Sequence, residues 1–224
     1  MGERAGGSAE YLRQSLLHLN HTVIHIDASQ SLPPIRERFD AIIISDFPSA
    51  KIDAAGADAI SRQIRDGTRF LMIGGWDSFS ARGKSYAGHP LESLLPVTLS
   101  GEDDRRNVPQ GLIVSIDSSL KSHPDAAELL REPPPVICGY NNAPPKPGAQ
   151  VLVWMNPIAS DGNTVRFLER IPLVVKHGSS VACLTDLAPH WCGGLVDWGG
   201  RRLSLAPVEV GRAYPVFVQF LLTA

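Results

Sequence analysis

The sequence of 224 residues lacks long hydrophobic runs and a charge excess of either sign. No stretch of about 18 apolar residues is present, so no membrane-spanning helix is expected. The first ten residues are polar and lack the apolar core of a signal peptide. Lys and Arg number 21 and Asp and Glu number 23, which gives a net charge of −2. Without a basic surface field, neither nucleic acid nor an anionic membrane is an expected partner.

Cysteine is scarce as well, with three widely spaced residues: Cys138, Cys183 and Cys192. An odd number at such spacings does not predict a disulfide framework, so a cytoplasmic location is expected. Cys138 and Cys183 lie in apolar, strand-like segments and are expected to be inert core residues. Cys192 follows Trp191 in a glycine-rich stretch, a setting that allows its thiol to be exposed.

Metal-binding motifs are also missing, since neither Cys-x-x-Cys nor His-Glu-x-x-His occurs. Asp186 and His190 could supply two ligands, but two ligands without a third do not define a site. Gly83-Lys84-Ser85 does not form a phosphate-binding loop, because Ser78 stands where that motif needs a glycine. We therefore expect no metal and no cofactor.

The first 80 residues alternate helix-like and strand-like segments. Their strands are uninterrupted apolar runs, which is typical of a parallel sheet covered by helices on both faces. The chain length favours a single domain over residues 1–224. The predicted elements in this half are helix 9–19, strand 22–27, strand 40–46, helix 53–66 and strand 69–75.

The rest of the chain is richer in turns and favours an antiparallel, hairpin-like block. A charged, turn-like stretch is expected over residues 101–110, and a terminal helix over 209–222 with Pro215 in or near its first turn. The remaining predicted elements are a short helical piece at 90–95, strand 112–116, helix 124–130 and strands 136–140, 150–154, 171–175 and 181–185.

The N-terminus departs from the usual order of a doubly wound fold, which opens with a strand. Here the segment 2–8 leads straight into a helix. We therefore expect the normally interior first strand to be absent, and residues 23–26 to pair directly and in parallel with residues 42–45. A regular strand within residues 1–8 would contradict this expectation.

Three predicted strands end in loops that carry an aspartate, and ligands of doubly wound sheets bind beyond such strand ends. The loops contain Asp46, Asp77 and Asp186, and the last two also contain Trp76 and Trp191. Aspartate is also favoured at helix and turn starts, so each of these residues has a purely structural alternative.

Several sequence blocks carry a resemblance to a known family. These are residues 40–49, Gly74-Gly-Trp-Asp-Ser-Phe79, Asn107-Val-Pro-Gln-Gly111, residues 135–141, Thr185-Asp-Leu-Ala-Pro-His-Trp191 and Val196-Asp-Trp-Gly199. With them, the chain from about Tyr11 onward resembles the class I glutamine amidotransferase-like family. The resemblance implies a flavodoxin-like α/β fold, with a mostly parallel sheet, helices on both faces and an antiparallel extension.

The activity that the family name suggests needs a cysteine nucleophile on a sharp turn after a central strand, activated by an oriented histidine. The strand in question is the apolar run 70–73, and Gly74, Gly75, Trp76 and Asp77 follow it. None of these is a thiol, and the hydroxyl of Ser78 comes one or two residues too late. The sequence therefore predicts a protein without glutaminase activity.

Two hypotheses for the function remain. The first is a non-catalytic module that binds a small polar, cationic or hydroxylated ligand or a partner, or that serves as a homo-oligomeric scaffold. The expected ligand-binding residues are Asp46, Gly75, Trp76, Asp77, Asp186, His190 and Trp191.

The second hypothesis is a hydrolase or transferase that works in the same cleft. Asp46 or Asp186 would act as base, His190 as acid or base, and the amides near Gly74 and Gly75 as an oxyanion site. An enzyme requires Asp46, Asp77 and His190 to face one open pocket. Carboxylates that are occupied by backbone hydrogen bonds would instead favour the binding module.

Overall fold

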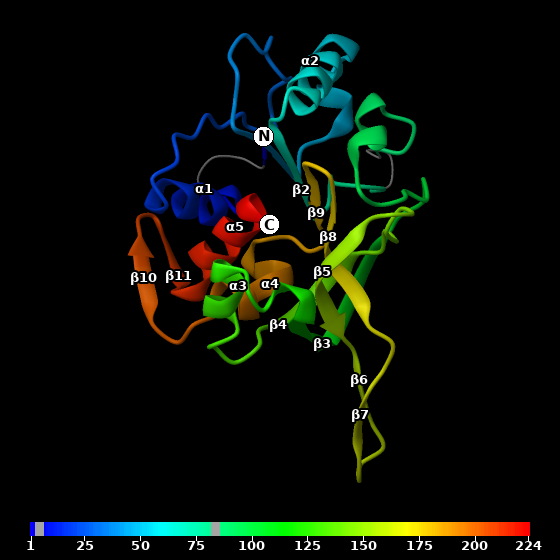
Figure 1. Cartoon of the computed structure of the whole chain (residues 1–224), viewed down its shortest axis with the longest axis vertical. Coiled ribbons are helices and arrows are strands. Elements are labelled where there is room, and N and C mark those ends of the chain that lie inside the picture. Colours follow the sequence, from blue (N-terminus) through cyan, green and yellow to red (C-terminus); the bar gives the residue numbers. More distant parts are fainter. Residues whose placement is uncertain (3–6, 82–85) are drawn as a thin grey trace.

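The computed structural model of the chain describes residues 1–2, 7–81 and 86–224 (Figure 1). Residues 83–85, for which a phosphate-binding loop was excluded above, lie outside this part. Its elements are α1 (Ala9–His18), β1 (Ala41–Ser45), η1 (Ser49–Lys51), α2 (Ala54–Arg65), β2 (Arg69–Ile73), η2 (Pro90–Leu94), β3 (Arg105–Ile116), η3 (Ser118–Leu120), α3 (Pro124–Leu129), β4 (Val136–Asn141), β5 (Gln150–Asn156), β6 (Ile158–Ser160), β7 (Val165–Phe167), β8 (Ile171–His177), β9 (Ser180–Cys183), α4 (Pro189–Val196), β10 (Arg202–Leu205), β11 (Val208–Gly211) and α5 (Ala213–Thr223).

The main sheet of the described residues has seven strands in the order β1-β2-β9-β8-β5-β3-β4. Only the pairs β1–β2 and β2–β9 are parallel, and the other four pairs are antiparallel. The fold is α/β as expected, but the prediction of a mostly parallel sheet is wrong. The hairpin of β8 and β9 inserts β9 beside β2, so the antiparallel block continues the same sheet and outweighs its parallel part.

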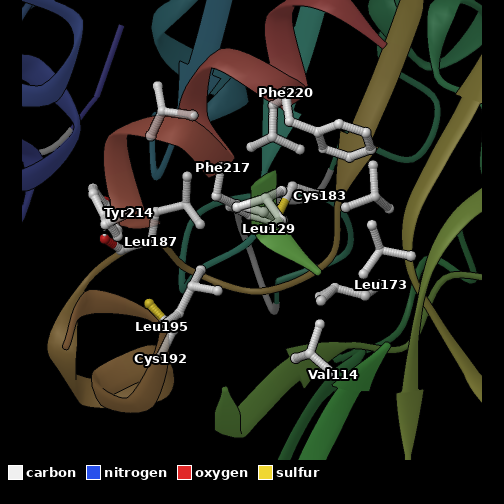
Figure 2. Packing of buried hydrophobic residues seen from close by; sticks show 14 of the residues in the cluster. Val114, Leu129, Leu173, Cys183, Leu187, Cys192, Leu195, Tyr214, Phe217 and Phe220 are labelled. Atoms are coloured by element: carbon white, nitrogen blue, oxygen red, sulfur yellow. Dashed lines mark hydrogen bonds between the residues drawn. The ribbon is translucent and has the colours of Figure 1, made fainter. Parts of the chain in front are cut away.

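Helices cover both faces of this sheet. Side chains along its buried strands point alternately into two hydrophobic clusters, one on each face. Leu71 and Ile73 of β2 join a cluster that includes Phe217 and Phe220 of α5, and Figure 2 shows these two rings beside Cys183. The neighbouring residues of β2 turn the other way, into a second cluster that contains residues of α2. β2 and β9 are therefore buried on both sides, as their apolar sequences predict, whereas β1 is only half-buried on the face of Ala41 and Ile43.

Two local predictions need correction. The charged stretch 101–110 is not a turn throughout, because β3 begins at Arg105 and pairs with β4. The terminal helix begins at Ala213 rather than 209, since residues 208–211 form a strand against β10. Pro215 still falls in the first turn of the helix, where its missing N–H costs no helical hydrogen bond.

The N-terminus differs from its prediction in an informative way. Residues 22–26 form no regular strand and do not pair with β1. Met1 and Gly2 lie between the two segments instead: the Ser45 N–H donates to the Met1 carbonyl at 2.9 Å, and the Gly2 N–H donates to the Ile26 carbonyl at 3.1 Å. The predicted direct pairing is therefore wrong, because two residues occupy part of the place of a central strand.

Among the residues that the structure describes, no helix has both the length and the apolar character of a membrane-spanning segment.

Candidate functional site

The three aspartate-containing loops identified in the sequence all begin at the same edge of the sheet. β1, β2 and β9 are adjacent and parallel, so the chain leaves each of them in the same direction. Asp46 follows β1 directly, Gly74 to Asp77 follow β2, and Asp186 lies three residues after the end of β9.

Asp46 holds the loop after β2 in position through hydrogen bonds. Its residue is only 4% exposed, and its Oδ1 accepts a hydrogen bond from the Asp77 N–H at 2.9 Å. The Asp46 N–H in turn donates to Ser78 Oγ at 3.1 Å. The backbone of Asp46 is left-handed, with φ of 48°, a conformation that aspartate tolerates better than most residues. Its carboxylate is thus engaged by backbone and is poorly placed to act as a base.

Gly75 makes this close approach possible. A Cβ atom at Gly75 would lie 1.8 Å from Asp46 Oδ1, and its φ of 148° is rarely adopted by residues with side chains. Any side chain at position 75 would therefore collide with the carboxylate of Asp46. The amides of this loop face neighbouring protein groups, which weakens their assignment as an oxyanion site.

A buried polar network, which the sequence analysis missed, holds the same loop from the other side. The amide of Asn141, fully buried, accepts from the Gly75 N–H at 2.9 Å and donates to the Gly75 carbonyl at 3.2 Å. It also donates to Asp104 Oδ1 at 2.8 Å, while Asp104 Oδ2 accepts from the Ser80 N–H at 3.0 Å. Burial raises the pKa of the Asp104 carboxyl, an effect that these two hydrogen bonds partly offset.

Asp104 belongs to the stretch 101–110, which was expected to be a charged turn, yet its residue is only 3% exposed. Arg105 pairs with Asp103, at 2.5 Å between Nη2 and Oδ2. Asp103 and Asp104 directly precede β3, and Asp104 is buried while Asp103 is exposed to solvent.

Asp186 and His190 form a pair at the start of α4. His190 Nε2 lies 2.8 Å from Asp186 Oδ2, with side-chain exposures of 36% and 6%. Pro189 opens the helix, and His190, the second residue of α4, lies beside the carboxylate of Asp186, which precedes the helix. Asp186 Oδ2 has no hydrogen-bond partner, so the pair is a close contact between a buried carboxylate and a partly exposed imidazole, two groups that can each hold a proton.

Two tryptophans connect this pair to the loop after β2. The rings of Trp76 and Trp191 are stacked, with centroids 6.4 Å apart and an interplanar angle of 24°, and the His190 ring lies 6.2 Å from Trp191. The guanidinium of Arg105 lies over Trp76, 4.6 Å from its centroid. We call Trp76, Arg105, His190 and Trp191 the aromatic platform; Trp76 is its most open member, with 52% exposure.

Trp191 is held in place by residues that the sequence analysis did not single out for this role. Its Nε1 donates to Asn107 Oδ1 at 3.0 Å. A Cβ atom at Gly139 would lie 2.2 Å from the indole ring, so the glycine leaves room for that ring against β4. Both residues are far from Trp191 in the sequence, and only strand pairing brings them together.

None of the three cysteines belongs to the turn after β2, although Cys183 of β9 pairs with Ile73 and its carbonyl accepts from the Gly74 N–H at 2.7 Å. Two of the predicted cysteine environments are wrong. Cys192, for which exposure was considered, is fully buried, and its Sγ donates to the Ala188 carbonyl. Cys138, expected in the core, is exposed on the edge strand β4. Burial raises the pKa of Cys183 to about 12 and that of Cys192 well above its usual range, which disfavours a reactive thiolate at both.

In the described part of the chain, no group of three or more His, Cys, Asp or Glu side chains is arranged to hold a metal ion.

Comparisons with known proteins agree with the sequence blocks quoted above. A family model described as "Putative glutamine amidotransferase" matches residues 5–203. The chain is similar to the solved structure of "Cytoplasmic Protein STM1381 from Salmonella typhimurium LT2", with 25% identity, a TM-score of 0.66, and coverage of 82% of this chain and 78% of that one. "Cytoplasmic Protein STM3548 from Salmonella typhimurium" shares the fold at 22% identity and a TM-score of 0.70, with 96% of this chain and 87% of that one covered. No curated protein matches.

Proposed function

The chain belongs to the "Putative glutamine amidotransferase" family, and on that premise we propose that it is a binding module of this family without glutaminase activity. Its ligand is a small polar molecule, cationic or hydroxylated, that binds at the aromatic platform and the Asp186–His190 pair. Two features of the loop after β2 carry this proposal. The loop has no thiol, and its Asp77 N–H donates a hydrogen bond to the carboxylate of Asp46.

The chemistry of the platform supports this class of ligand. An exposed indole attracts cations and stacks on the flat faces of hydroxylated rings, and Trp76 offers such a surface while Trp191, only 4% exposed, supports it from beneath. Arg105 is paired with Asp103, so its charge is compensated, and Asp186 adds a carboxylate beside His190. A phosphate group would meet repulsion from that carboxylate, and neither nucleic acid nor a membrane is proposed as a partner. The proposed location is the cytoplasm, in line with the names of the two similar Salmonella proteins.

The first expected result is the absence of glutamine hydrolysis. Without a thiolate at the turn after β2, no acyl-enzyme forms by the usual route. Ammonia release from glutamine by the purified protein should equal that of buffer, while an active glutaminase run in parallel confirms the assay. A thiol-directed glutamine analogue should leave residues 74–78 unlabelled. Hydrolysis that disappears in Cys192→Ala would contradict the proposal and identify a nucleophile.

The second expected result concerns ligand binding, measured by thermal shift over a panel of small polar, cationic and hydroxylated compounds. A ligand at one hundred times its Kd stabilises the fold by about 2.7 kcal/mol, which raises the Tm by several degrees. In Asp186→Asn and His190→Ala the affinity should fall at least tenfold while the unliganded Tm stays close to that of the parent. His177→Ala, an exposed histidine outside the site, is the matched control. Equal binding by all variants would place the ligand elsewhere.

The hydrolase or transferase remains the second candidate, because the Asp186–His190 pair places a partly exposed imidazole beside a buried carboxylate. It would work without Asp46, whose carboxylate is engaged. A compound from the same panel that is consumed over time, and consumed no longer by His190→Ala, would favour this candidate over the binding module.

The scaffold version of the binding module has a separate source of support. The β6–β7 hairpin extends away from the rest of the molecule (Figure 1), and it exposes Val165 and Phe167 at 70% and 66%. Such apolar exposure is a common property of surfaces that associate. The molar mass in solution distinguishes the versions, since a monomer would leave ligand binding as the function.

A further inference from the structure

Two planar side chains of β3 contact the tryptophans of the aromatic platform. Arg105 and Asn107 are two residues apart in a regularly paired part of β3, so their side chains project from the same face of the sheet. Arg105 lies over Trp76, and Asn107 Oδ1 accepts from Trp191 Nε1. Each of the two stacked indoles therefore has a planar side chain with N–H donors beside it.

The donors of these two side chains are only partly used within the described residues. The hydrogen bonds from Arg105 Nε and Nη2 to Asp103 account for two of the five N–H groups of the guanidinium. Asn107 is exposed, and its bond to Trp191 engages the carbonyl oxygen of the amide, not its N–H groups. Side-chain exposures of 25% for Arg105 and 38% for Asp103 leave both side chains accessible to a ligand.

A cationic ligand would meet a cation that is already part of the platform. The guanidinium of Arg105 lies 4.6 Å from the centroid of Trp76. Its positive charge already benefits from the negative face of the indole, and it would repel a second positive charge on the same ring. The attraction that an indole normally offers to a cation is therefore reduced at Trp76.

The carboxylates near Trp76 do not supply a counter-charge for such a ligand. Both oxygens of Asp103 accept from Arg105, and this hydrogen bonding is the largest of the causes that raise the pKa of Arg105. Asp104 and Asp77 act on the same guanidinium in the same direction. Asp186 is buried, with a side-chain exposure of 6%. The negative charge around Trp76 is therefore already matched to Arg105.

A neutral ring that carries hydroxyl groups satisfies these constraints. Its C–H face can stack on Trp76, which is 52% exposed, without bringing a charge to the indole. Each hydroxyl is both a donor and an acceptor, so two adjacent hydroxyls can accept from Arg105 and donate to Asp103 at the same time. Residues 105 and 107 are about 7 Å apart along β3, which is the scale of one such ring with its substituents.

We infer that the aromatic platform binds a neutral carbohydrate ring, which stacks on Trp76 and forms hydrogen bonds with Arg105 and Asn107. This inference rests on the function proposed above and narrows its ligand from cationic or hydroxylated compounds to neutral hydroxylated rings. Binding is expected to be weak, because an open platform buries less of a ligand than a concave pocket does.

The test compares two probes, methyl β-glucopyranoside and tetramethylammonium, by saturation-transfer difference NMR on the full chain. The glucoside should bind, with the strongest saturation at its ring C–H protons, and tetramethylammonium should not bind. Trp76→Leu removes the flat face, and Arg105→Lys keeps the charge but replaces the planar fork by one ammonium group. Each substitution should weaken glucoside binding about tenfold or more.

Arg170→Lys is the matched control for Arg105→Lys. The guanidinium of Arg170 also lies over a tryptophan, 4.4 Å from the centroid of Trp154, in a pair that is not part of the aromatic platform. The same substitution there should leave glucoside binding as it is in the parent chain.

Three outcomes would overturn the inference. Binding of tetramethylammonium without binding of the glucoside would do so, while the binding module proposed above would stand. Equal glucoside affinity of the parent, Trp76→Leu and Arg105→Lys would show that the sugar binds elsewhere on the chain. Binding of neither probe would also overturn the inference, whereas the proposed function fails only if no compound of the thermal-shift panel binds at the platform.

Discussion

Gly194→Ala is expected to destabilise the protein by about 3 kcal/mol, whereas Gly193→Ala should be neutral or mildly stabilising. Both glycines lie in α4. A Cβ atom at Gly194 would lie 2.2 Å from the Val136 carbonyl oxygen and 2.9 Å from its nitrogen, while a Cβ atom at Gly193 would meet no atom within 4 Å. The contacted atoms are backbone of β4 and cannot rotate away, so α4 must shift.

The two substitutions are matched in helix and in chemistry, so their difference isolates the contact between α4 and β4. Alanine gains up to about 1 kcal/mol over glycine from helix propensity, which Gly193→Ala can realise and Gly194→Ala cannot. Urea unfolding of both variants and the parent gives the free energies of unfolding. A shift of α4 should also weaken ligand binding, because the helix carries His190 and Trp191. Equal stabilities would refute the tight packing of α4 on β4.

Asn141→Ala is expected to cost about 3 to 5 kcal/mol, and Asn142→Ala less than about 0.5 kcal/mol. The first substitution leaves the N–H and carbonyl of Gly75 and the carboxylate of Asp104 without the amide that now satisfies them. Each buried polar group without a partner costs about 1 to 3 kcal/mol, and more if it is charged. Asn142 is exposed and serves as the matched control.

The cost of Asn141→Ala should depend on pH through Asp104. Its pKa is raised in the folded protein, and the hydrogen bond from Asn141 is one of the contacts that keep it from rising further. Without Asn141 the charged carboxylate is disfavoured still more, so the deficit should be largest at neutral pH. It should shrink as the pH falls toward the usual aspartate value of 3.8 and the folded carboxyl is protonated. A deficit that is constant from pH 7 to pH 4 would argue against a charged Asp104 in the network.

The Asn141 network also connects stability to the proposed site. Gly75 leads directly into Trp76, and the amide of Asn141 fixes the peptide groups on either side of Gly75. Ligand binding at the aromatic platform should therefore weaken in Asn141→Ala even at temperatures where the variant is fully folded. Such a loss would distinguish a loop-positioning role of Asn141 from a contribution to global stability alone.

Much of the framework could be predicted from local sequence patterns. The apolar runs that form β1 and β2, and the amphipathic stretch of α2, have periodicities that depend only on neighbouring residues. The absence of a thiol after β2 is a property of composition and needs no fold. The blocks at residues 74–79 and 185–191 carry the family resemblance for the same reason, since side chains that share a loop are close in sequence.

Other properties depended on partners that are distant in the chain. The sequence-based prediction placed Cys138 in the core and allowed Cys192 to be exposed, whereas Cys138 is exposed and Cys192 is buried. Burial is set by which strand lies at the edge of the sheet and which helix packs beneath it. Residues 101–110 looked like a charged turn, yet pairing with β4 makes Arg105 the start of a strand.

The sequence alone thus determined the type of the parallel strands and helices, the identity of the strand-end loops, and the absence of a thiol directly after β2. Tertiary structure alone decided that Asn141 and Asp104 hold Gly75, that Arg105 covers Trp76, and that Met1 enters the sheet beside β1. The physical reason is the range of the forces that decide each property. Periodicity and turn preference act over a few residues, whereas strand order, register and burial arise only when segments far apart in the chain compete for the same hydrogen bonds and the same apolar core.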